Sequence, residues 1–255
     1  NSLAQSAVCA FVYAFHRLLG TYKRVDLITL TDFDKQKLLE FNTRHRVFDP
    51  ARLFVKPNTA APEGPLPPLV PWSGRKNQVV FAGRLEELKG LRTAVEGWKL
   101  LANDPDAPEL LIVGDGPLTD WAKAQAVPRV RLLGRLPREE LRTLLGESRA
   151  VLAPSLCYES FALVPAEAHV MGTPVLASDL GNVGAMVRPG VDGLRFVPGD
   201  AAALAEAVRA LPALGEKMAP AAVRAAALAA FAPEENYRQL MEIYRAVLDG
   251  TPAPQ

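Results

Sequence analysis

Two glutamates with different surroundings lie close together in the stretch YESFALVPAEAHVMGTP, residues 158–174. Pro165 is typical of the first turn of a helix and Gly172 of a helix end, so the stretch divides into a loop and a short helix. Glu159 then belongs to the loop, and Glu167 lies about one turn into the helix. Backbone N–H groups at the helix start favour an anion, and here they belong to Ser160, Phe161, Ala162 and Leu163.

These residue types indicate a ligand that is charged in the middle and hydroxylated at its ends. Two carboxylates beside an anion site repel the ligand unless they accept hydrogen bonds from hydroxyl groups. A diphosphate with a sugar at one end and a ribose at the other meets both requirements. The pattern therefore favours a nucleotide sugar, although Glu167 taken alone is also consistent with an acidic residue that stabilises a helix start.

A second stretch, GRLEELKG at residues 83–90, offers cations for a diphosphate. Gly83 permits a tight exit from a strand, while Arg84 and Lys89 supply a planar guanidinium and a point charge around the start of a helix. Two such cations on either side of one cleft suit a diphosphate. A solvated surface pair is the alternative interpretation, and these residues alone leave it open.

Other motifs carry weaker signals. The turn GDGPL, residues 114–118, either lets the backbone approach another group closely or reverses the chain, and it does not match the GxGxxG dinucleotide pattern. Asp104 and Asp106 follow a predicted helix, which indicates a helix-ending loop. No metal site is therefore expected, and the histidines are interpreted as structural: His16, His45 and His169.

The elements that must position these residues are strands and helices in alternation. Six short apolar runs are unbroken, as in parallel strands buried on both faces: 79–82, 110–113, 130–133, 150–153, 174–177 and 194–197. Helical patterns separate them, which predicts an α/β fold with a doubly wound parallel sheet. Such sheets bind ligands beyond the carboxyl ends of their strands, and both charged stretches follow predicted strands.

Composition divides the chain into four parts. Residues 75–232 form the predicted Rossmann-like nucleotide-sugar-binding domain, and the proline-rich residues 57–74 before it are interpreted as a stiff linker. Residues 1–56 carry a helix, a strand, a second helix and a short strand, and they are expected to be the tail of an incomplete N-terminal domain. Residues 233–255 hold an amphipathic closing helix and a tail, so helical additions are expected at both ends.

Charge and cysteine content exclude several classes of protein. The 255 residues carry 29 Lys and Arg against 28 Asp and Glu, intermixed along the chain, so neither a nucleic-acid binder nor a polybasic membrane anchor is expected. The apolar run at residues 6–20 is too short to span a bilayer. Cys9 and Cys157 form no CxxC motif, metal spacing or disulfide framework, which fits a reducing compartment, and both are expected to be buried.

From residue 79 to residue 198 the sequence resembles the C-terminal, donor-binding domain of retaining GT-B-fold glycosyltransferases of family 4, the glycosyl transferases group 1. The family's order and spacing are followed through FAGRLEELKG, LLIVGDGPL, VRLLGRL, APSLCYESFALVPAEAHVMGTPVLAS and VDGLRFVPGD. The earlier segments VDLITLTDFDKQKLLE and RLFVKPNTA are similar to the end of the family's N-terminal domain. The fold expected from the resemblance is the Rossmann-like half of a GT-B protein.

The resemblance implies a role for each candidate residue. Arg84 and Lys89 would bind the donor diphosphate and, with Glu159 at the transferred sugar, would be catalytic. Glu167 would bind the ribose hydroxyls, and the backbone N–H groups between the two glutamates would cradle sugar and phosphate. The implied donor-binding set, in which the segment around Arg131 and Leu133 lines the base, is Gly83, Arg84, Lys89, Arg131, Leu133, Glu159, Ser160, Phe161, Ala162, Leu163 and Glu167.

The implied activity is transfer of a sugar, of the hexosyl type, from a UDP-, GDP- or ADP-sugar to an acceptor with retention of configuration. No metal or other cofactor is expected, because cations and amides would stabilise the departing nucleoside diphosphate. The acceptor, a glycan or a lipid-linked molecule, is left open. The intact protein is expected to be cytoplasmic, with attachment to the inner face of a membrane also left open.

The chain departs from the family at three places. Ala162 stands where the EGFGL-type loop usually has glycine, and Ala185, in GNVGA, stands where the family's GG..E turn has glutamate. The family's N-terminal domain, which supplies a glycine-rich loop and the acceptor pocket, is not found ahead of Asn1. This chain alone is therefore expected to be a fragment that binds the donor weakly and turns it over poorly or not at all.

Two other functions are kept as alternatives. One is a nucleotide-sugar epimerase of the same fold, which the GRLEELKG stretch and the paired glutamates disfavour. The other is a noncatalytic nucleotide-sugar-binding or interaction module. Self-association is expected through apolar residues of the opening segment: Phe11, Val12, Phe15 and Leu19.

Overall fold

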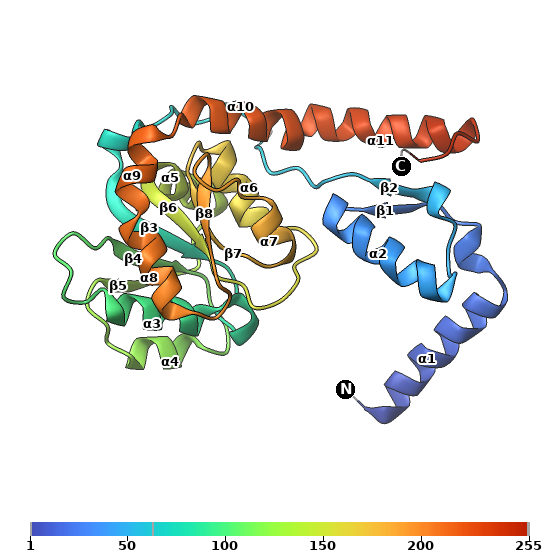
Figure 1. Ribbon diagram of the computed structural model, residues 1–255, viewed down its shortest axis with the longest axis horizontal. Helices are drawn as coiled ribbons and strands as arrows, with labels where there is room; N and C mark the ends of the chain where they lie inside the picture. The colour runs from blue at the N-terminus through green and yellow to red at the C-terminus, as the bar shows by residue number, and fades with distance from the viewer. Residues whose placement is uncertain (1, 63, 254–255) are drawn as a thin grey trace. The chain divides into compact units, whose positions relative to one another are not determined.

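The computed structural model describes residues 2–62 and 64–253, and the chain forms two compact units (Figure 1). Unit 1 comprises residues 1–57 and 236–255, and unit 2 comprises residues 58–235. Every residue of the predicted donor site belongs to unit 2.

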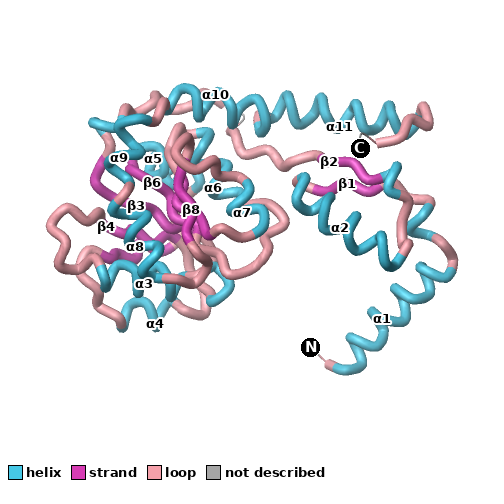
Figure 2. The backbone as a smooth tube through the Cα atoms, viewed as in Figure 1, coloured by secondary structure: helices cyan, strands magenta, loops and turns pink. Residues whose placement is uncertain are grey.

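Unit 2 is built on one parallel sheet (Figure 2). Its strands are β3 (Lys76–Ala82), β4 (Glu109–Val113), β5 (Val130–Gly134), β6 (Ser148–Ala153), β7 (Val175–Ser178) and β8 (Gly193–Phe196). Their order in the sheet is β5-β4-β3-β6-β7-β8, and every neighbouring pair is parallel. Each predicted apolar run falls on one of these strands, so the predicted α/β fold is confirmed.

Helices connect the strands and follow the last of them. They are α3 (Leu91–Leu100), α4 (Thr119–Ala124), α5 (Arg138–Glu147), α6 (Leu163–Val170), α7 (Gly181–Ala185), α8 (Ala201–Arg209), α9 (Leu211–Lys217) and α10 (Pro220–Phe231). Local sequence explains several helix starts. The carboxylate of Asp200 accepts hydrogen bonds from the N–H groups of Ala202 and Ala203 at the start of α8, both at 2.9 Å. Pro220 occupies the first turn of α10, where its missing N–H costs no hydrogen bond.

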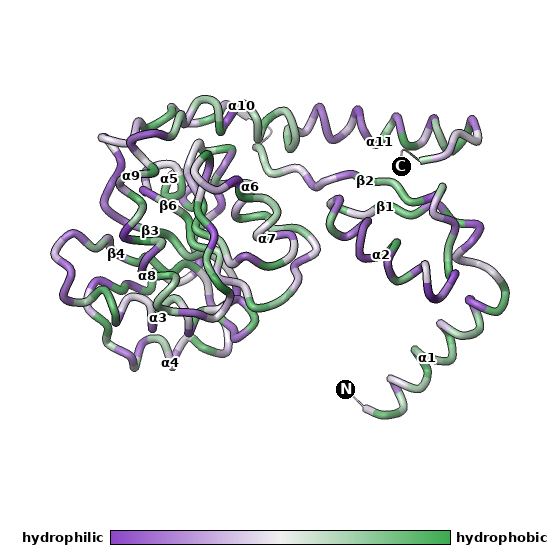
Figure 3. Tube along the Cα trace, in the orientation of Figure 1, coloured by the Kyte–Doolittle hydropathy of each residue, from purple (hydrophilic) through white to green (hydrophobic). Residues whose placement is uncertain are grey.

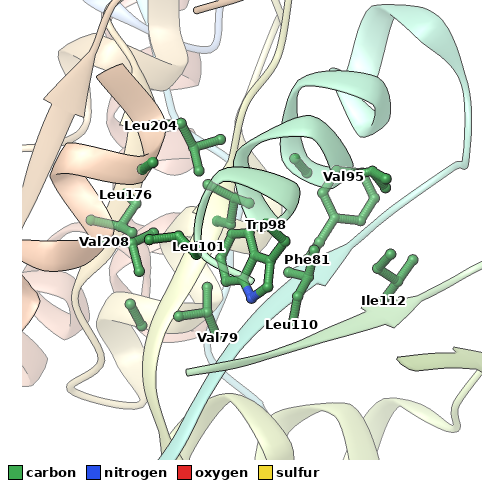
Figure 4. Close-up of a cluster of buried hydrophobic side chains, with 14 of the residues drawn as sticks. Val79, Phe81, Val95, Trp98, Leu101, Leu110, Ile112, Leu176, Leu204 and Val208 are labelled. Carbon is green, nitrogen blue, oxygen red and sulfur yellow. The ribbon is translucent and has the colours of Figure 1, made fainter. Parts of the chain in front are cut away.

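Both faces of the sheet are buried, which is why its strands read as unbroken apolar runs. Along β3, Val79 and Phe81 join a core cluster with α3 and α8, whereas Val80 between them joins a second cluster with α5, α6 and α10. Trp98 of α3 is 1% exposed within the first cluster, and its indole N–H donates to the carbonyl of Pro108 at 2.8 Å (Figure 4). Alternate side chains of one strand thus hold a helical layer on each face.

The strand order creates a topological switch point beside β3. The chain proceeds from β3 to β4 and β5 on one side, then returns to β6 on the other side of β3 and continues to β7 and β8. The loops that follow β3 and β6 therefore diverge at the carboxyl edge of the sheet, and a crevice opens between such loops. Both charged stretches of the predicted site follow these two strands.

The proline-rich residues 58–62 and 64–74 pack against the rest of unit 2. They contain a short 3₁₀ turn, η3 (Trp72–Gly74). The N–H of Ala60 donates to the carbonyl of Phe231 at 3.0 Å, and a Cβ atom on Gly215 would lie only 2.1 Å from the indole ring of Trp72. The segment interpreted as a linker is thus also part of the packing of this unit.

Unit 1 has a two-stranded parallel sheet and two small cores. It contains α1 (Leu3–Leu18), β1 (Leu27–Thr29), α2 (Asp32–His45), β2 (Leu53–Val55) and most of α11 (Pro233–Leu248). One core includes Leu53, and the other joins Phe54 to Ile243 of α11. The buried amide of Asn42 donates to the carbonyl of Phe48 at 2.9 Å, which anchors the loop after α2.

Helix α1 has no buried residue, although hydrophobic residues dominate it (Figure 3). Phe11 is 70% exposed, and Cys9 is exposed as well. Cys157, in the loop after β6, is half-buried, so the prediction of two buried cysteines is wrong. Among the described residues, no helix combines the length and the apolar character needed to cross a membrane.

Candidate functional site

Two adjoining hollows lie at the carboxyl edge of the sheet in unit 2. The larger, about 1050 Å³, is lined by the turns after β3, β4 and β5 and by α6. The smaller, about 230 Å³, is lined by the loops after β3 and β6 and by the start of α6. Both hollows are lined by Ala82, Gly83, Arg84, Leu163 and Val164. One elongated ligand can therefore occupy both.

Lys89 and Glu159, predicted as separate contacts, form one ion pair across the crevice. Lys89 Nζ lies 2.8 Å from Glu159 Oε2, and the hydroxyl of Ser155 donates to the other carboxylate oxygen. The Glu159 side chain is 16% exposed and the Lys89 side chain 32%, so the pair is partly shielded from solvent. The loops after β3 and β6 also touch directly. A Cβ atom added to Gly90, at φ +73°, would lie 1.8 Å from the carbonyl oxygen of Pro154.

Arg84 borders both hollows with most of its side chain in solvent. The side chain is 67% exposed, and Arg84 Nε lies 3.3 Å from Glu86 Oε2. Glu86 lines neither hollow. Because an exposed ion pair contributes little to stability, the guanidinium can exchange this partner for an anion in the hollow.

Glu167 lies on α6, and its carboxylate contacts an arginine absent from the predicted set. The Glu167 side chain is 4% exposed, and its Oε1 lies 3.1 Å from Nη2 and 3.3 Å from Nε of Arg138. Arg138 is the first residue of α5, just after β5. The rule that ligands bind beyond strand ends could therefore have selected it from the sequence.

The backbone of the glycine turn at residues 114–118 lies in close contact with the loop after β3. The N–H of Leu85 donates to the carbonyl of Asp115 at 2.8 Å. A Cβ atom on Gly114, at φ +128°, would lie 1.9 Å from the carbonyl oxygen of Gly83. The turn thus braces the loop that carries the first cation of the site.

Arg131 and Leu133, expected beside the base, line neither hollow. Both lie within β5, where Arg131 Nη1 is 3.5 Å from Glu109 Oε2 and Leu133 packs against a core cluster. Side chains inside a strand face the two sides of the sheet, so they do not reach its carboxyl edge. The residues of this segment that line the larger hollow follow the strand: Arg135, Leu136 and Arg138.

Helix α6 begins at Leu163, after Ala162 at the N-cap, and no side chain caps its first N–H groups. Ala162 has φ −81°, so alanine in place of the family's glycine needs no left-handed backbone here. The residues GNVGA form the short helix α7 rather than a turn, and Ala185 is exposed on it. The lost glutamate therefore leaves no buried gap.

Asn182 of α7 holds the loop between β6 and α6. The residue is 2% exposed, and its Nδ2 donates to the carbonyls of Glu159, at 2.5 Å, and Ser160, at 3.0 Å. Nothing in the sequence signals this contact, because its two partners lie 23 and 22 residues away in the chain.

Among residues 2–62 and 64–253, no three His, Cys, Asp or Glu side chains are grouped so that they could hold a metal ion. Asp104 and Asp106 lie in the loop after α3, as predicted. His169 is buried on α6 with its Nε2 3.2 Å from the carbonyl oxygen of Asp192. Burial lowers the pKa of His169, so its role is that of a neutral structural group.

The sequence of unit 2 is similar to sequences of known proteins. Residues 76–213 match the family described as "Glycosyl transferases group 1". A glycogen synthase of Mycobacterium tuberculosis is 36% identical over 153 residues, 57% of this chain and 37% of that protein. A D-inositol 3-phosphate glycosyltransferase 1 of Catenulispora acidiphila is 33% identical over 192 residues, 68% of this chain and 44% of that protein. The chain thus spans about two fifths of the length of these relatives.

Solved structures share the fold at low sequence identity. A glycosyltransferase from Rickettsia africae matches with a TM-score of 0.73 at 19% identity, covering 92% of this chain and 66% of that one. HepE from Anabaena, solved with UDP-glucose, matches with a TM-score of 0.67 at 19% identity, covering 93% of this chain and 67% of that one.

Proposed function

Because this chain belongs to the glycosyl transferases group 1 family, we propose that residues 58–235 bind a nucleotide diphosphate sugar and that the protein transfers the sugar to an acceptor. Within the family, we assign it to the retaining enzymes known as family 4. The observation that carries the proposal is the Lys89–Glu159 pair beside Arg84 in adjoining hollows at a topological switch point. HepE was solved with UDP-glucose, which favours a UDP-sugar as the first donor to test.

The lining of the two hollows suggests how the donor lies. We place the nucleoside in the larger hollow, with the ribose hydroxyls on Glu167, whose buried carboxylate already accepts hydrogen bonds from an arginine. The base then lies toward Arg135 and Leu136, which take the role first given to residues inside β5. The diphosphate passes Arg84, which borders both hollows, and the sugar enters the smaller hollow beside Glu159.

Electrostatic stabilisation of the leaving group is the chemistry that these residues supply. Transfer breaks the bond between the anomeric carbon and a phosphate oxygen, which keeps the bonding electrons, so the departing nucleoside diphosphate gains negative charge. A hydroxyl oxygen of the acceptor forms the new bond to the anomeric carbon, and its proton passes to the departing phosphate oxygen. In this proposal, the groups that stabilise that charge are Arg84, Lys89 and the uncapped N–H groups at the start of α6. Since these groups supply the positive charge, we expect donor binding to be unchanged by a chelator such as EDTA.

The proposal is tested by calorimetric titration of the whole chain with UDP, GDP and ADP. One of the three is expected to bind, and the variants Arg84→Ala and Glu167→Gln are expected to weaken it about tenfold or more, because each removes a charge-assisted contact. A folded chain that binds none of the three nucleotides contradicts the proposal.

Arg131→Ala is the matched control for Arg84→Ala. Arg131 is 61% exposed and pairs with a glutamate, as Arg84 does at 67%, but it lies outside both hollows. Its loss is expected to leave nucleotide affinity unchanged. Weakened binding in this variant would instead place the base along β5.

A further inference from the structure

The loop between β6 and α6 is held by a side chain that lies outside the proposed donor site. Asn182 is 2% exposed and lines neither hollow. Its single amide nitrogen donates to two successive carbonyls, those of Glu159 and Ser160. Both carbonyls are therefore fixed on the side of the loop that faces α7.

Fixing these carbonyls also fixes two N–H groups. In a trans peptide the C=O and N–H groups point in opposite directions, and every peptide bond that the structure describes is trans. The carbonyl of Glu159 shares a peptide with the N–H of Ser160, and the carbonyl of Ser160 shares one with the N–H of Phe161. Both N–H groups therefore point away from Asn182.

These two N–H groups are available to a ligand. Among the described residues, neither the N–H of Ser160 nor that of Phe161 donates to a backbone or side-chain acceptor. Glu159 and Phe161 line the smaller hollow, and Asn182 does not. Unpaired donors at this position, just ahead of α6, present partial positive charge to an anion.

We propose that Asn182 is a positioning residue that aims the N–H groups of Ser160 and Phe161 at the donor diphosphate. This inference rests on the proposed donor site. Asn182 touches neither nucleotide nor sugar and acts through the two carbonyls that it binds. It is the second residue of GNVGA, on the helix α7.

The test is titration of the whole, ¹⁵N-labelled chain with UDP, followed by NMR and calorimetry. In the unmodified protein, UDP is expected to shift the amide resonances of Ser160 and Phe161 together with those of Gly83 and Gly116. Asn182→Asp keeps the shape of the side chain but replaces the donating nitrogen with oxygen. This variant is expected to bind UDP about tenfold more weakly and to lose the shifts of Ser160 and Phe161 while keeping those of the two glycines.

Two further variants separate positioning from charge and from general loss of structure. Asn182→Ala removes the donor without adding a negative charge, and it is expected to behave like Asn182→Asp. Asn42→Asp makes the same change at another buried asparagine that anchors a loop, in unit 1. This control is expected to leave UDP affinity and all four resonance shifts unchanged.

Each contrary outcome has a distinct meaning. UDP-induced shifts of Gly83 and Gly116 without shifts of Ser160 and Phe161 in the unmodified chain would overturn the role of Asn182 and leave the donor site standing. Asn182 variants that bind UDP with unchanged affinity and unchanged shifts would also overturn the role of Asn182. So would weaker UDP binding in Asn182→Asp that is not seen in Asn182→Ala, because the added negative charge would then explain it. An unmodified chain that shows no response to UDP overturns the donor site as well.

Discussion

Arg75 joins three segments of unit 2 through one buried guanidinium. The residue is 4% exposed and donates, at 2.6–3.0 Å, to the carbonyls of Gly146, Ser148 and Gly172 and to the hydroxyl of Thr173. The carbonyl of Gly146 belongs to the last turn of α5, where the helix dipole favours a positive charge, and Gly172 lies two residues beyond the end of α6. Burial, with a smaller contribution from the charge of Arg224, lowers the pKa of Arg75 to about 10, so it stays charged at neutral pH.

Replacing Arg75 by methionine is expected to destabilise unit 2 by roughly 3 kcal/mol, because several buried acceptors lose their donor. Urea unfolding followed by tryptophan fluorescence measures this directly, since all three tryptophans, Trp72, Trp98 and Trp121, lie in unit 2. Arg149→Met is the matched control: Arg149 donates to one side chain, that of Asn77, and its guanidinium lies 5.2 Å from the centre of the Trp72 ring, so its loss is expected to cost about 1 kcal/mol. Equal losses in the two variants would contradict the role of Arg75.

Single residues of the candidate site could be predicted from the sequence where they directly follow a strand. They could not be predicted where their position depends on a contact with a residue far away in the sequence. Arg84 and Glu159 follow β3 and β6, so the strand-end rule found them. Arg138 follows β5 and was missed, although the same rule applies to it. Asn182 gives no local signal, because its contact depends on how α7 packs against a loop 22 residues earlier.

Among the elements, α6 joins the loop that follows β6 to a buried histidine. His169 lies two residues after Glu167 on this helix, and burial, the largest cause, holds its pKa below the ordinary value of 6.5. The charge of Arg188 acts in the same direction, while Asp192 opposes both. His169 is therefore neutral in the folded state, whereas the unfolded chain takes up a proton there below about pH 6.5.

The stability of unit 2 is accordingly expected to fall as the pH drops below about 6.5, by up to about 1.4 kcal/mol per pH unit, because the unfolded state binds one more proton. Above that pH this residue causes no change. Urea midpoints measured by tryptophan fluorescence between about pH 5.5 and 7.5 test this. His169→Gln is expected to flatten the dependence, and His45→Gln, at an exposed site in unit 1, is expected to leave it intact. An unchanged slope in His169→Gln would argue against this account.

The elements themselves were largely readable from the sequence. Strands buried on both faces must be continuously apolar, so six runs located six strands without further information. The helix α7 at Gly181–Ala185 was not predicted, because a stretch of five residues is too short for periodicity to reveal. The packing of the proline-rich segment was equally hidden, since proline content predicts stiffness and not contacts.

At the scale of the whole molecule, α1 exposes an apolar surface that favours association between copies of the chain. Leu3 is 92% exposed, Phe11 70% and Leu18 85%. We expect oligomers that dissociate on dilution, detectable by sedimentation velocity over a range of concentrations. Phe11→Glu is expected to shift the chain toward monomer, whereas Val197→Glu, at a residue 60% exposed in unit 2, is expected not to. A chain that stays monomeric at high concentration would refute this prediction.

Unit 2 can be removed from the chain, or replaced, as one continuous segment. Unit 2 is one uninterrupted stretch, residues 58–235, inserted between two stretches that together build unit 1. The two ends left by its removal are neighbours, because the Asn236 side chain donates to the carbonyl of Pro57 and accepts from Lys56 Nζ at 2.8 Å. Residues 58–235 can therefore be exchanged as a single segment, while a short bridge from Pro57 to Asn236 restores the continuity of the remaining chain.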